Sequence, residues 1–227
     1  MLDHILLVSD EVERPFLTET LRAHAPQLDI RPLPNMAAVG AIDTAILPDT
    51  RLVSFGFDQP LPQAILNALG HGAYNFHPGP PAYAGWQPAA FAAYDGVTEF
   101  GATLHAISAR EDGGAIVAVD TFPVAPGTSR AELARGAYLA MLGLFRHLAH
   151  ALATRPAILP TLSMSWGPRR GTRALFAALC DLSPDIDEAE LRRRIHGLGG
   201  GDGISAPTVW LHGVPFRHLM PGDDRSK

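Results

Sequence analysis

Short apolar runs alternate with helical patterns along the first part of the chain, and this alternation limits the possible folds more than any other feature. The uninterrupted apolar run from Ile5 to Val8 is typical of a strand that is buried on both faces of a parallel sheet. The segment from Val12 to His24 then has apolar residues at helical spacing, and Leu28 to Leu33 reads as a second strand. A strand, a helix and a strand in this order form a βαβ unit, which predicts a parallel sheet with crossover helices.

The same alternation continues further along the chain. Further strands are expected at Ile42–Leu47, Leu52–Phe55 and Ala73–His77, and helices at Pro60–Leu69, Gln87–Tyr94 and Ser129–Thr154. Ala102–Ile107 and Ala115–Val124 have strand composition and are predicted to form a hairpin-like pair. The predicted fold is therefore α/β, a Rossmann-like open and mostly parallel sheet with flanking helices.

The pattern of predicted elements changes after Pro156. Ser163–Thr172 reads as a linker, Asp187–Ile195 as a charged helix, and Thr208–Leu211 with Val214–Leu219 as a hairpin. We therefore expect a main domain over residues 1–160, followed by a linker and a small appendage with a helix and a hairpin over residues 161–227. The hairpin and Trp210 could form a homodimer interface, so a homodimer is one alternative for the oligomeric state.

Composition excludes several classes of protein. A chain of 227 residues with 47% hydrophobic and 18% charged residues is ordinary for a globular protein. A formal net charge of -5 disfavours nucleic acid as a partner. The single cysteine, Cys180, cannot form an internal disulfide, which is consistent with a reducing compartment. His147 and His150 lie one helical turn apart without an evident third ligand, so we predict no metal site.

No signal peptide or membrane span is expected. The apolar run at the amino terminus is too short for a signal peptide, and the longest apolar candidate, Tyr138 to Ala153, is interrupted by Arg146. A cytoplasmic protein without a membrane partner is the resulting expectation.

Three polar residues carry the chemistry that the sequence offers. Asn75 and His77 are two residues apart on a predicted strand, so both side chains project to the same side of it, about 6.6 Å apart. They lie at the carboxyl end of that strand, where ligands bind in open α/β sheets. Asp112 follows in a later loop. An amide donor, an imidazole and a carboxylate form an oxyanion site with a proton relay, although each motif alone is a common accident.

At these residues the sequence resembles the 10-formyltetrahydrofolate-dependent formyltransferase family, which includes glycinamide ribonucleotide, methionyl-tRNA and amino-sugar formyltransferases. The family pattern of Asn-x-His-Pro, a proline-containing loop that ends in glycine, and a later Asp-x-Gly is matched here by Asn75–Pro78, the loop to Gly85, and Asp112–Gly114. The resemblance runs from about Leu52 to Val124. Residues 1–160 would then be a formyltransferase catalytic domain.

The resemblance implies a formyl donor, an acceptor and residue roles. The donor is 10-formyltetrahydrofolate, the acceptor is the amine of a small molecule such as a nucleotide-linked amino sugar, and no metal is needed. Asn75 and His77 would stabilise the developing oxyanion, and Asp112 would favour the imidazolium and help to remove the amine proton. The folate would contact two segments, comprising Ser54, Phe55, Gly56, Phe57, Pro60, Arg110, Glu111, Gly113 and Gly114.

The sequence departs from the family pattern at one loop, and two alternative functions therefore stay open. The loop after His77-Pro78 begins Gly79-Pro80-Pro81-Ala82, where the family usually has Ser-Leu-Leu-Pro, and it is one residue shorter before Gly85. The identity of the acceptor therefore cannot be inferred from the family. The same residues could instead hydrolyse 10-formyltetrahydrofolate with water as the acceptor, or serve a non-catalytic folate-binding or scaffold protein on the same fold.

Overall fold

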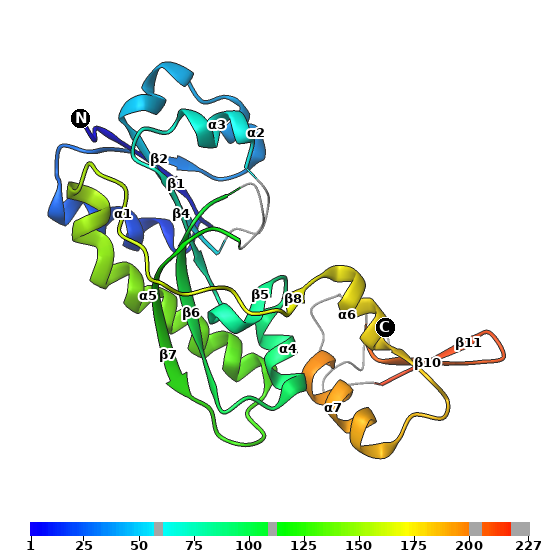
Figure 1. Ribbon diagram of the computed structural model, residues 1–227. Helices are drawn as coiled ribbons and strands as arrows, with labels where there is room; N and C mark the ends of the chain where they lie inside the picture. The colour runs from blue at the N-terminus through cyan, green and yellow to red at the C-terminus, as the bar shows by residue number, and fades with distance from the viewer. Residues whose placement is uncertain (57–60, 109–112, 200–205, 219–227) are drawn as a thin grey trace.

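A computed structural model describes residues 1–56, 61–108, 113–199 and 206–218 of the protein. Within these residues, six strands form the main sheet in the order β2-β1-β3-β4-β6-β7 (Figure 1). They are β1 (His4–Val8), β2 (Asp29–Leu33), β3 (Thr50–Phe55), β4 (Ala73–His77), β6 (Glu99–Ala106) and β7 (Ile116–Pro123). The first four run parallel, whereas β6 is antiparallel to β4 and β7 to β6. The predicted open and mostly parallel sheet is confirmed.

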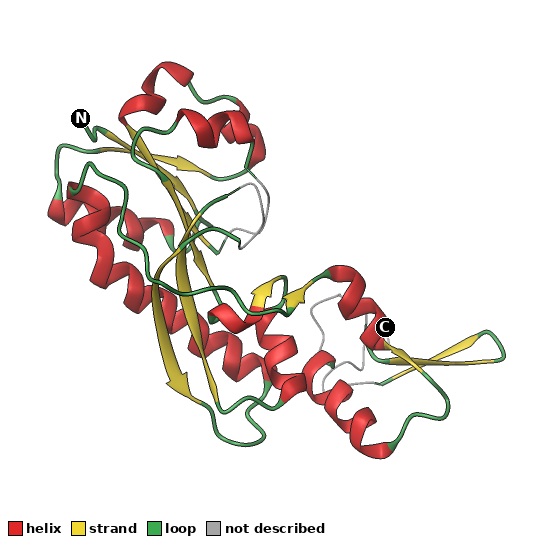
Figure 2. Ribbon diagram, viewed as in Figure 1, coloured by secondary structure: helices red, strands yellow, loops and turns green. Residues whose placement is uncertain are grey.

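Helices lie on both faces of this sheet (Figure 2). They are α1 (Arg14–His24), α2 (Met36–Gly40), α3 (Gln63–Ala68), α4 (Pro88–Asp95), α5 (Arg130–Thr154), α6 (Arg173–Cys180) and α7 (Glu188–Leu198), with 3-10 helices η1 (Thr44–Asp49) and η2 (Pro81–Tyr83). The helices α1 and α5 enclose one large apolar core with the sheet, and the segment with α2, η1 and α3 encloses a second core on the other face. The sheet is thus the middle of three layers.

One sequence prediction was wrong. Ile42–Leu47 is not a strand, because η1 covers its second half and extends to Asp49. The carboxylate of Asp43 accepts a hydrogen bond from the Ala45 amide at 3.0 Å, which starts a helical turn. Ile42, Ile46 and Leu47 still pack into the second core. The run is apolar because its residues pack into the core. An apolar run this short is compatible with either a strand or a helical turn.

The longest helix, α5, is fixed at both ends. At its start, Ser129 and Glu132 form the predicted capping box, in which each side chain bonds the other residue's backbone amide. At its end lies Arg51 of β3, which is fully buried. Its guanidinium donates to the carbonyl oxygens of His71, Ala151, Leu152, Arg155 and Ala157 at 2.6–3.1 Å. A cation at the negative end of a helix, with its donors satisfied, ties α5 to the sheet.

The carboxyl-terminal part of the chain packs against α4 at one end of the sheet (Figure 1). A small cluster joins Phe91 of α4 to Phe176 and Cys180 of α6 and to Leu198 of α7. Short strands complete this part: β5 (Ala84–Gly85) pairs with β8 (Arg170–Gly171), and β9 (Asp181–Leu182) pairs with β10 (Thr208–Leu211), which forms the expected hairpin with β11 (Val214–Arg217). Neither α6 nor the three short strands were predicted from the sequence.

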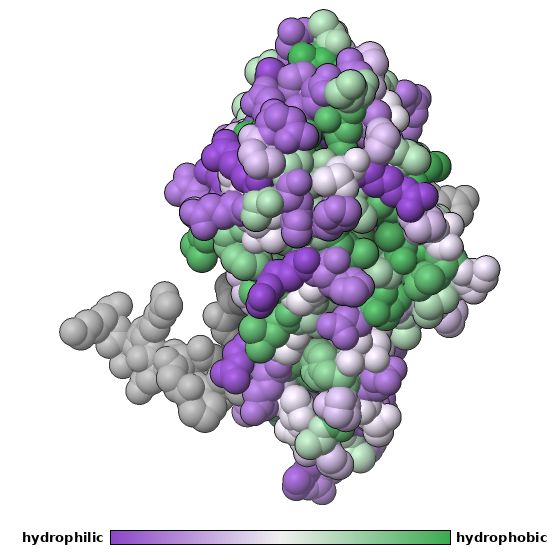
Figure 3. Space-filling view, turned by 90° about the vertical axis from the view of Figure 1, so that its left-hand side faces the viewer, coloured by the Kyte–Doolittle hydropathy of each residue, from purple (hydrophilic) through white to green (hydrophobic). Residues whose placement is uncertain are grey.

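The surface carries both hydrophilic and hydrophobic side chains. Figure 3, in which the side of the molecule that carries α1 and α5 faces the viewer, shows hydrophilic side chains over much of this face and hydrophobic ones between them. Exposed apolar residues on these helices include Phe16 and Leu139, and the hairpin exposes Trp210 and Phe216. Among the described residues, no helix has the length and apolar character that a membrane span requires.

Candidate active site

The candidate site is built on two neighbouring antiparallel strands. In the register of β4 and β6, Asn75 is paired with His105 and His77 with Thr103, so all four side chains lie on one face of the sheet. Phe76, between the two polar residues of β4, points to the other face and packs against Phe145 of α5. Alternation along β4 therefore presents the amide and the imidazole together. Both are nearly enclosed, with 8% of Asn75 and 4% of His77 exposed.

Asn75 and His105 are hydrogen-bonded, and their partners assign the proton positions. Asn75 Nδ2 lies 3.3 Å from His105 Nε2, and His105 Nδ1 lies 2.9 Å from the carbonyl oxygen of Ala106. A carbonyl oxygen only accepts, so His105 carries its proton on Nδ1 and accepts on Nε2. That lone pair selects the amide nitrogen of Asn75 as its neighbour. One N–H of the carboxamide is thereby used, and the second remains available as a donor.

The carbonyl end of the same side chain has no such partner. Asn75 Oδ1 is buried and makes no hydrogen bond with any of the described residues. A buried oxygen without a donor costs about 1–3 kcal/mol. Unsatisfied polar atoms of this kind are uncommon in folded proteins and call for an explanation. A ligand that brings a donor into the site would satisfy this oxygen.

His77 is held by the loop that follows it. Its Nε2 donates to the carbonyl oxygen of Tyr83 at 2.9 Å, because a carbonyl oxygen only accepts. Gly79 lies directly against this contact, because a Cβ there would come within 2.8 Å of both His77 Nε2 and Pro88 Cβ. The carbonyl oxygen of Gly79 accepts from Thr103 Oγ1 at 2.8 Å. The loop thus encloses the imidazole closely and needs glycine at its first position.

The predicted folate contacts are only partly within the described residues. Ser54 is paired with Asn75 across β3 and β4 and is buried, Phe55 points into the large core, and Gly56 is exposed with φ of 69°. Gly113 is exposed and Gly114 is buried. The other predicted site residues, Phe57, Pro60, Arg110, Glu111 and Asp112, lie outside the described residues.

Neither His105 nor Trp166 was predicted from the sequence as a site residue. His105 lies opposite Asn75, and Trp166 comes from the segment that follows α5. The indole of Trp166 packs at 5.7 Å from the His77 ring and 5.1 Å from the His105 ring, and its Nε1 donates to the Gly114 carbonyl at 2.8 Å. Alternation of Thr103 and His105 with apolar residues on β6 could have indicated His105. No sequence signal places Trp166, since its contacts are made across the fold.

Several arginines of the carboxyl-terminal part have acidic partners. Arg169 pairs with Asp95, Arg192 with Glu188, and Arg194 with Glu190. In residues 1–56, 61–108, 113–199 and 206–218, no group of three His, Cys, Asp or Glu side chains could hold a metal ion.

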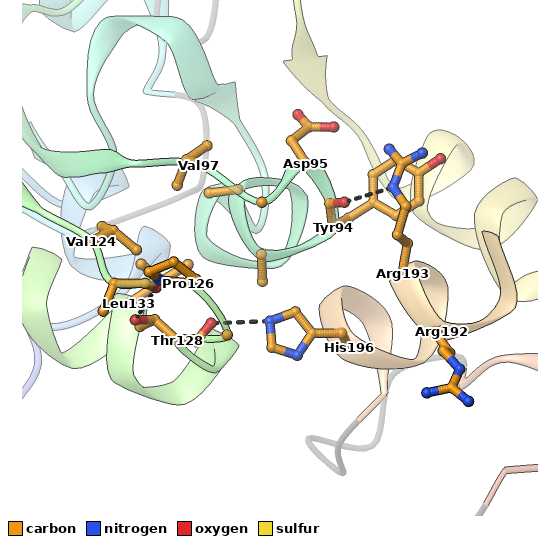
Figure 4. A pocket seen from close by; sticks show the side chains of 15 residues that line it. Tyr94, Asp95, Val97, Val124, Pro126, Thr128, Leu133, Arg192, Arg193 and His196 are labelled. Atoms are coloured by element: carbon orange, nitrogen blue, oxygen red, sulfur yellow. Dashed lines mark hydrogen bonds between the residues drawn. The ribbon is translucent and has the colours of Figure 1, made fainter. Parts of the chain in front are cut away.

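A separate surface groove of about 310 Å³ lies between α4, the segment 124–128 and α7 (Figure 4). His196 points across it to the carbonyl oxygen of Thr128, at 3.0 Å, and Arg193 lies beside Tyr94. None of the predicted site residues lines this groove. The groove is therefore separate from the candidate site on β4 and β6.

Known proteins that resemble this chain are formyltransferases. Residues 37–138 match the formyl transferase family model. Methionyl-tRNA formyltransferase of Chlamydia caviae is 41% identical over 75 residues, which are 33% of this chain and 23% of that protein. The chain thus matches less than a quarter of the length of this curated relative.

Solved structures share the fold over most of the chain. A sugar N-formyltransferase from Shewanella sp FDAARGOS_354 superposes with a TM-score of 0.77, with 20% identity, and covers 97% of this chain and 98% of its own. An N-formyltransferase from Helicobacter canadensis, solved with folinic acid and dTDP-3-aminofucose, superposes with a TM-score of 0.61, with 14% identity, 87% of this chain and 81% of its own. The similarity extends beyond the matched domain into the carboxyl-terminal part.

Proposed function

We propose that the protein is a folate-dependent N-formyltransferase that moves the formyl group of 10-formyltetrahydrofolate to the amine of a small molecule. The observation that carries this proposal is the Asn75 side chain, whose amide is oriented by His105 and whose Oδ1 is buried without a partner among the described residues. The family match and the folinic acid in the Helicobacter canadensis structure support a folate donor.

The residues of the site have the properties that such a transfer requires. The free N–H of Asn75 can donate to the formyl oxygen, on which negative charge develops as the amine attacks. Asn75 Oδ1 can accept an N–H of the amine and so orient its lone pair toward the formyl carbon. The amine nitrogen forms the new bond to that carbon, the bond from carbon to N10 breaks, the amine loses one proton, and N10 gains one.

His77 and Asp112 are proposed to move these protons. With Nε2 bonded to the Tyr83 carbonyl, His77 can take up or give a proton at Nδ1 while the ring keeps its orientation. Asp112 would favour the charged imidazole, as the family resemblance implies. Ser54, Gly56, Gly113 and Gly114 are proposed to contact the folate, together with the predicted contacts that lie outside the described residues.

For the acceptor, we propose a small biosynthetic amine, of which a nucleotide-linked amino sugar is the first candidate. The structural similarity to sugar N-formyltransferases over nearly the whole chain supports this choice. The net charge of -5 and the pairing of Arg169, Arg192 and Arg194 with carboxylates disfavour an RNA acceptor.

The experiment is an assay of the full chain with 10-formyltetrahydrofolate and a panel of amines, in which formylated products are detected by mass spectrometry. Asn75→Ala, His77→Ala and Asp112→Asn should each reduce transfer by about 100-fold or more. His147→Ala, an exposed change on α5, is the matched control and should leave transfer unchanged. Formate release without an amine product would indicate a hydrolase, and folate binding without turnover would indicate a scaffold.

A further inference from the structure

The carboxyl-terminal part of the chain reaches the loop that encloses His77. The short strands β5 and β8 run parallel and pair with each other (Figure 1). Their backbones approach so closely that a Cβ at Gly85 would come within 2.4 Å of the Gly171 carbonyl oxygen. Tyr83 and Arg169, which immediately precede the two strands, therefore lie at the same end of this small sheet.

The side chains of Tyr83 and Arg169 meet at one carboxylate oxygen. Tyr83 Oη donates to Asp95 Oδ2 at 2.9 Å, and Nη1 of Arg169 forms an ion pair with the same oxygen. Burial, and then the hydrogen bond to Asp95, raise the pKa of Tyr83, so the phenol stays protonated and is the donor. The guanidinium of Arg169 also lies over the rings of Phe91 and Tyr94, at 5.8 Å from each centroid. Both partners of Asp95 are therefore fixed in place.

The position of Asp95 is unfavourable for a carboxylate that lacks such partners. Asp95 is the last residue of α4, and the carboxyl end of a helix carries a partial negative charge. The side chains of Asp95 and Arg169 are 27% and 33% exposed, so solvent screens this ion pair and its contribution to stability is small. Stability therefore gives little reason for a carboxylate at this position.

The backbone of Tyr83 is what these contacts hold. Its carbonyl oxygen accepts from His77 Nε2 at 2.9 Å, and its amide donates to the carbonyl oxygen of Pro80 at 2.9 Å. Its ring packs against Phe100, with 6.0 Å between the centroids. Because the hydroxyl, the ring and the amide of Tyr83 are all fixed, its carbonyl oxygen stays in one position and holds the imidazole in one orientation.

We infer that Arg169, Asp95 and Tyr83 are positioning residues of formyl transfer, through which the carboxyl-terminal part of the chain orients the imidazole of His77. This role needs no contact between the three side chains and a substrate, because they act through the Tyr83 carbonyl oxygen. The inference rests on the proposed formyl transfer. It adds to that proposal a part in the reaction for the segment Ser163–Thr172, which the sequence predicts as a linker.

The test follows the imidazole of His77 and the reaction separately. Nitrogen-15 NMR of the full chain with labelled histidine reports whether Nε2 of His77 carries a proton, and His77→Gln identifies its signals. Nε2 should be protonated in wild type, and Tyr83→Phe and Arg169→Met should each lower the protonated fraction. Both variants should lower kcat by about tenfold and leave KM for 10-formyltetrahydrofolate within about twofold, because a misoriented catalytic group costs rate more than binding.

Tyr94→Phe is the matched control. It removes a hydroxyl of the same helix, α4, that donates to Glu190 of α7 at 2.8 Å, and it keeps the ring beneath Arg169. The His77 signals and kcat should stay at their wild-type values in this variant. Arg169→Lys keeps the charge, should lose less than Arg169→Met, and provides the comparison if Arg169→Met does not fold.

Two results would overturn the inference alone. One is wild-type kcat in both Tyr83→Phe and Arg169→Met. The other is a lower kcat with Nε2 of His77 still fully protonated, which is the result of a merely structural role. If the wild-type protein transfers formyl to no amine, the proposed function fails first, and the inference fails with it.

Discussion

The amide nitrogen of Asn75 lies 3.3 Å from Nε2 of His105, on the neighbouring antiparallel strand. This pairing explains how a carboxamide, which rotates readily and has two similar ends, presents a defined end to a substrate. The proton of His105 is directed to the Ala106 carbonyl, so the lone pair on Nε2 selects the nitrogen of Asn75. His105 is thus a positioning residue for the proposed oxyanion donor.

We expect His105→Ala to lower kcat for formyl transfer by about 100-fold while KM for the donor changes little, because a misplaced donor mainly costs transition-state stabilisation. His105→Gln retains an acceptor for the amide N–H and should recover part of this loss. Steady-state kinetics of both variants provide the measurement. Equal losses in the two variants would show that the acceptor on His105 does not orient Asn75.

The sequence predicted the common direction of Asn75 and His77, but not the side chains that surround them. Asn75 and His77 are adjacent in a strand whose alternation is local, so their common direction follows from the pattern. Their partners lie on other elements: His105 faces Asn75 only through the register of β4 and β6, and Trp166 only through the path of a linker. Likewise, Ile42–Leu47 was predicted as a strand because an apolar run indicates that its residues are buried. Residues of this run also pack into the core from η1, so their burial does not distinguish a strand from a helical turn.

Arg51→Ala should destabilise the protein by at least about 3 kcal/mol, because it removes a buried cation and leaves several carbonyl oxygens without donors. The free energy of unfolding from urea titration measures this loss. Arg31→Ala removes an exposed ion pair with Asp29 and should cost less than about 1 kcal/mol. A loss below that of Arg31→Ala would mean that Arg51 does not stabilise the end of α5.

The capping box of α5 predicts a pH dependence. The Ser129 side chain, and then its backbone amide, lower the pKa of Glu132 by hydrogen bonding to the carboxylate. A lowered folded-state pKa means that the charged form stabilises the fold above the unfolded pKa, and that this contribution disappears as the pH falls through the folded pKa. Glu132→Gln should therefore be less stable than wild type at neutral pH and approach it in acid. Urea unfolding at pH 7 and pH 3 compares the two; a pH-independent difference would contradict the assignment.

Cys180 should resist thiol reagents in the folded protein. Burial raises the pKa of Cys180 to about 11, despite the nearby arginines Arg130 and Arg194, so little thiolate is present at neutral pH. Its position in the cluster with Phe91 and Phe176 also limits access. Labelling with a chromogenic disulfide reagent should be complete in denaturant and slower by about 100-fold or more without it. Rapid labelling under native conditions would show that α6 separates readily from α4.

The glycine that begins the shortened loop provides the sharpest test of how the site is built. A Cβ at position 79 would meet His77 Nε2 and Pro88 Cβ at 2.8 Å. Gly79→Ser should push the imidazole away from the Tyr83 carbonyl and reduce kcat by about tenfold or more, since small displacements of a catalytic group are costly. Gly143→Ala, on α5 with only an ordinary contact to Asp120, is the matched control and should leave activity unchanged and stability equal or higher by about 0.5–1 kcal/mol. Full activity of Gly79→Ser would show that the loop can move to admit the larger side chain, and that the close enclosure of His77 is not needed for transfer.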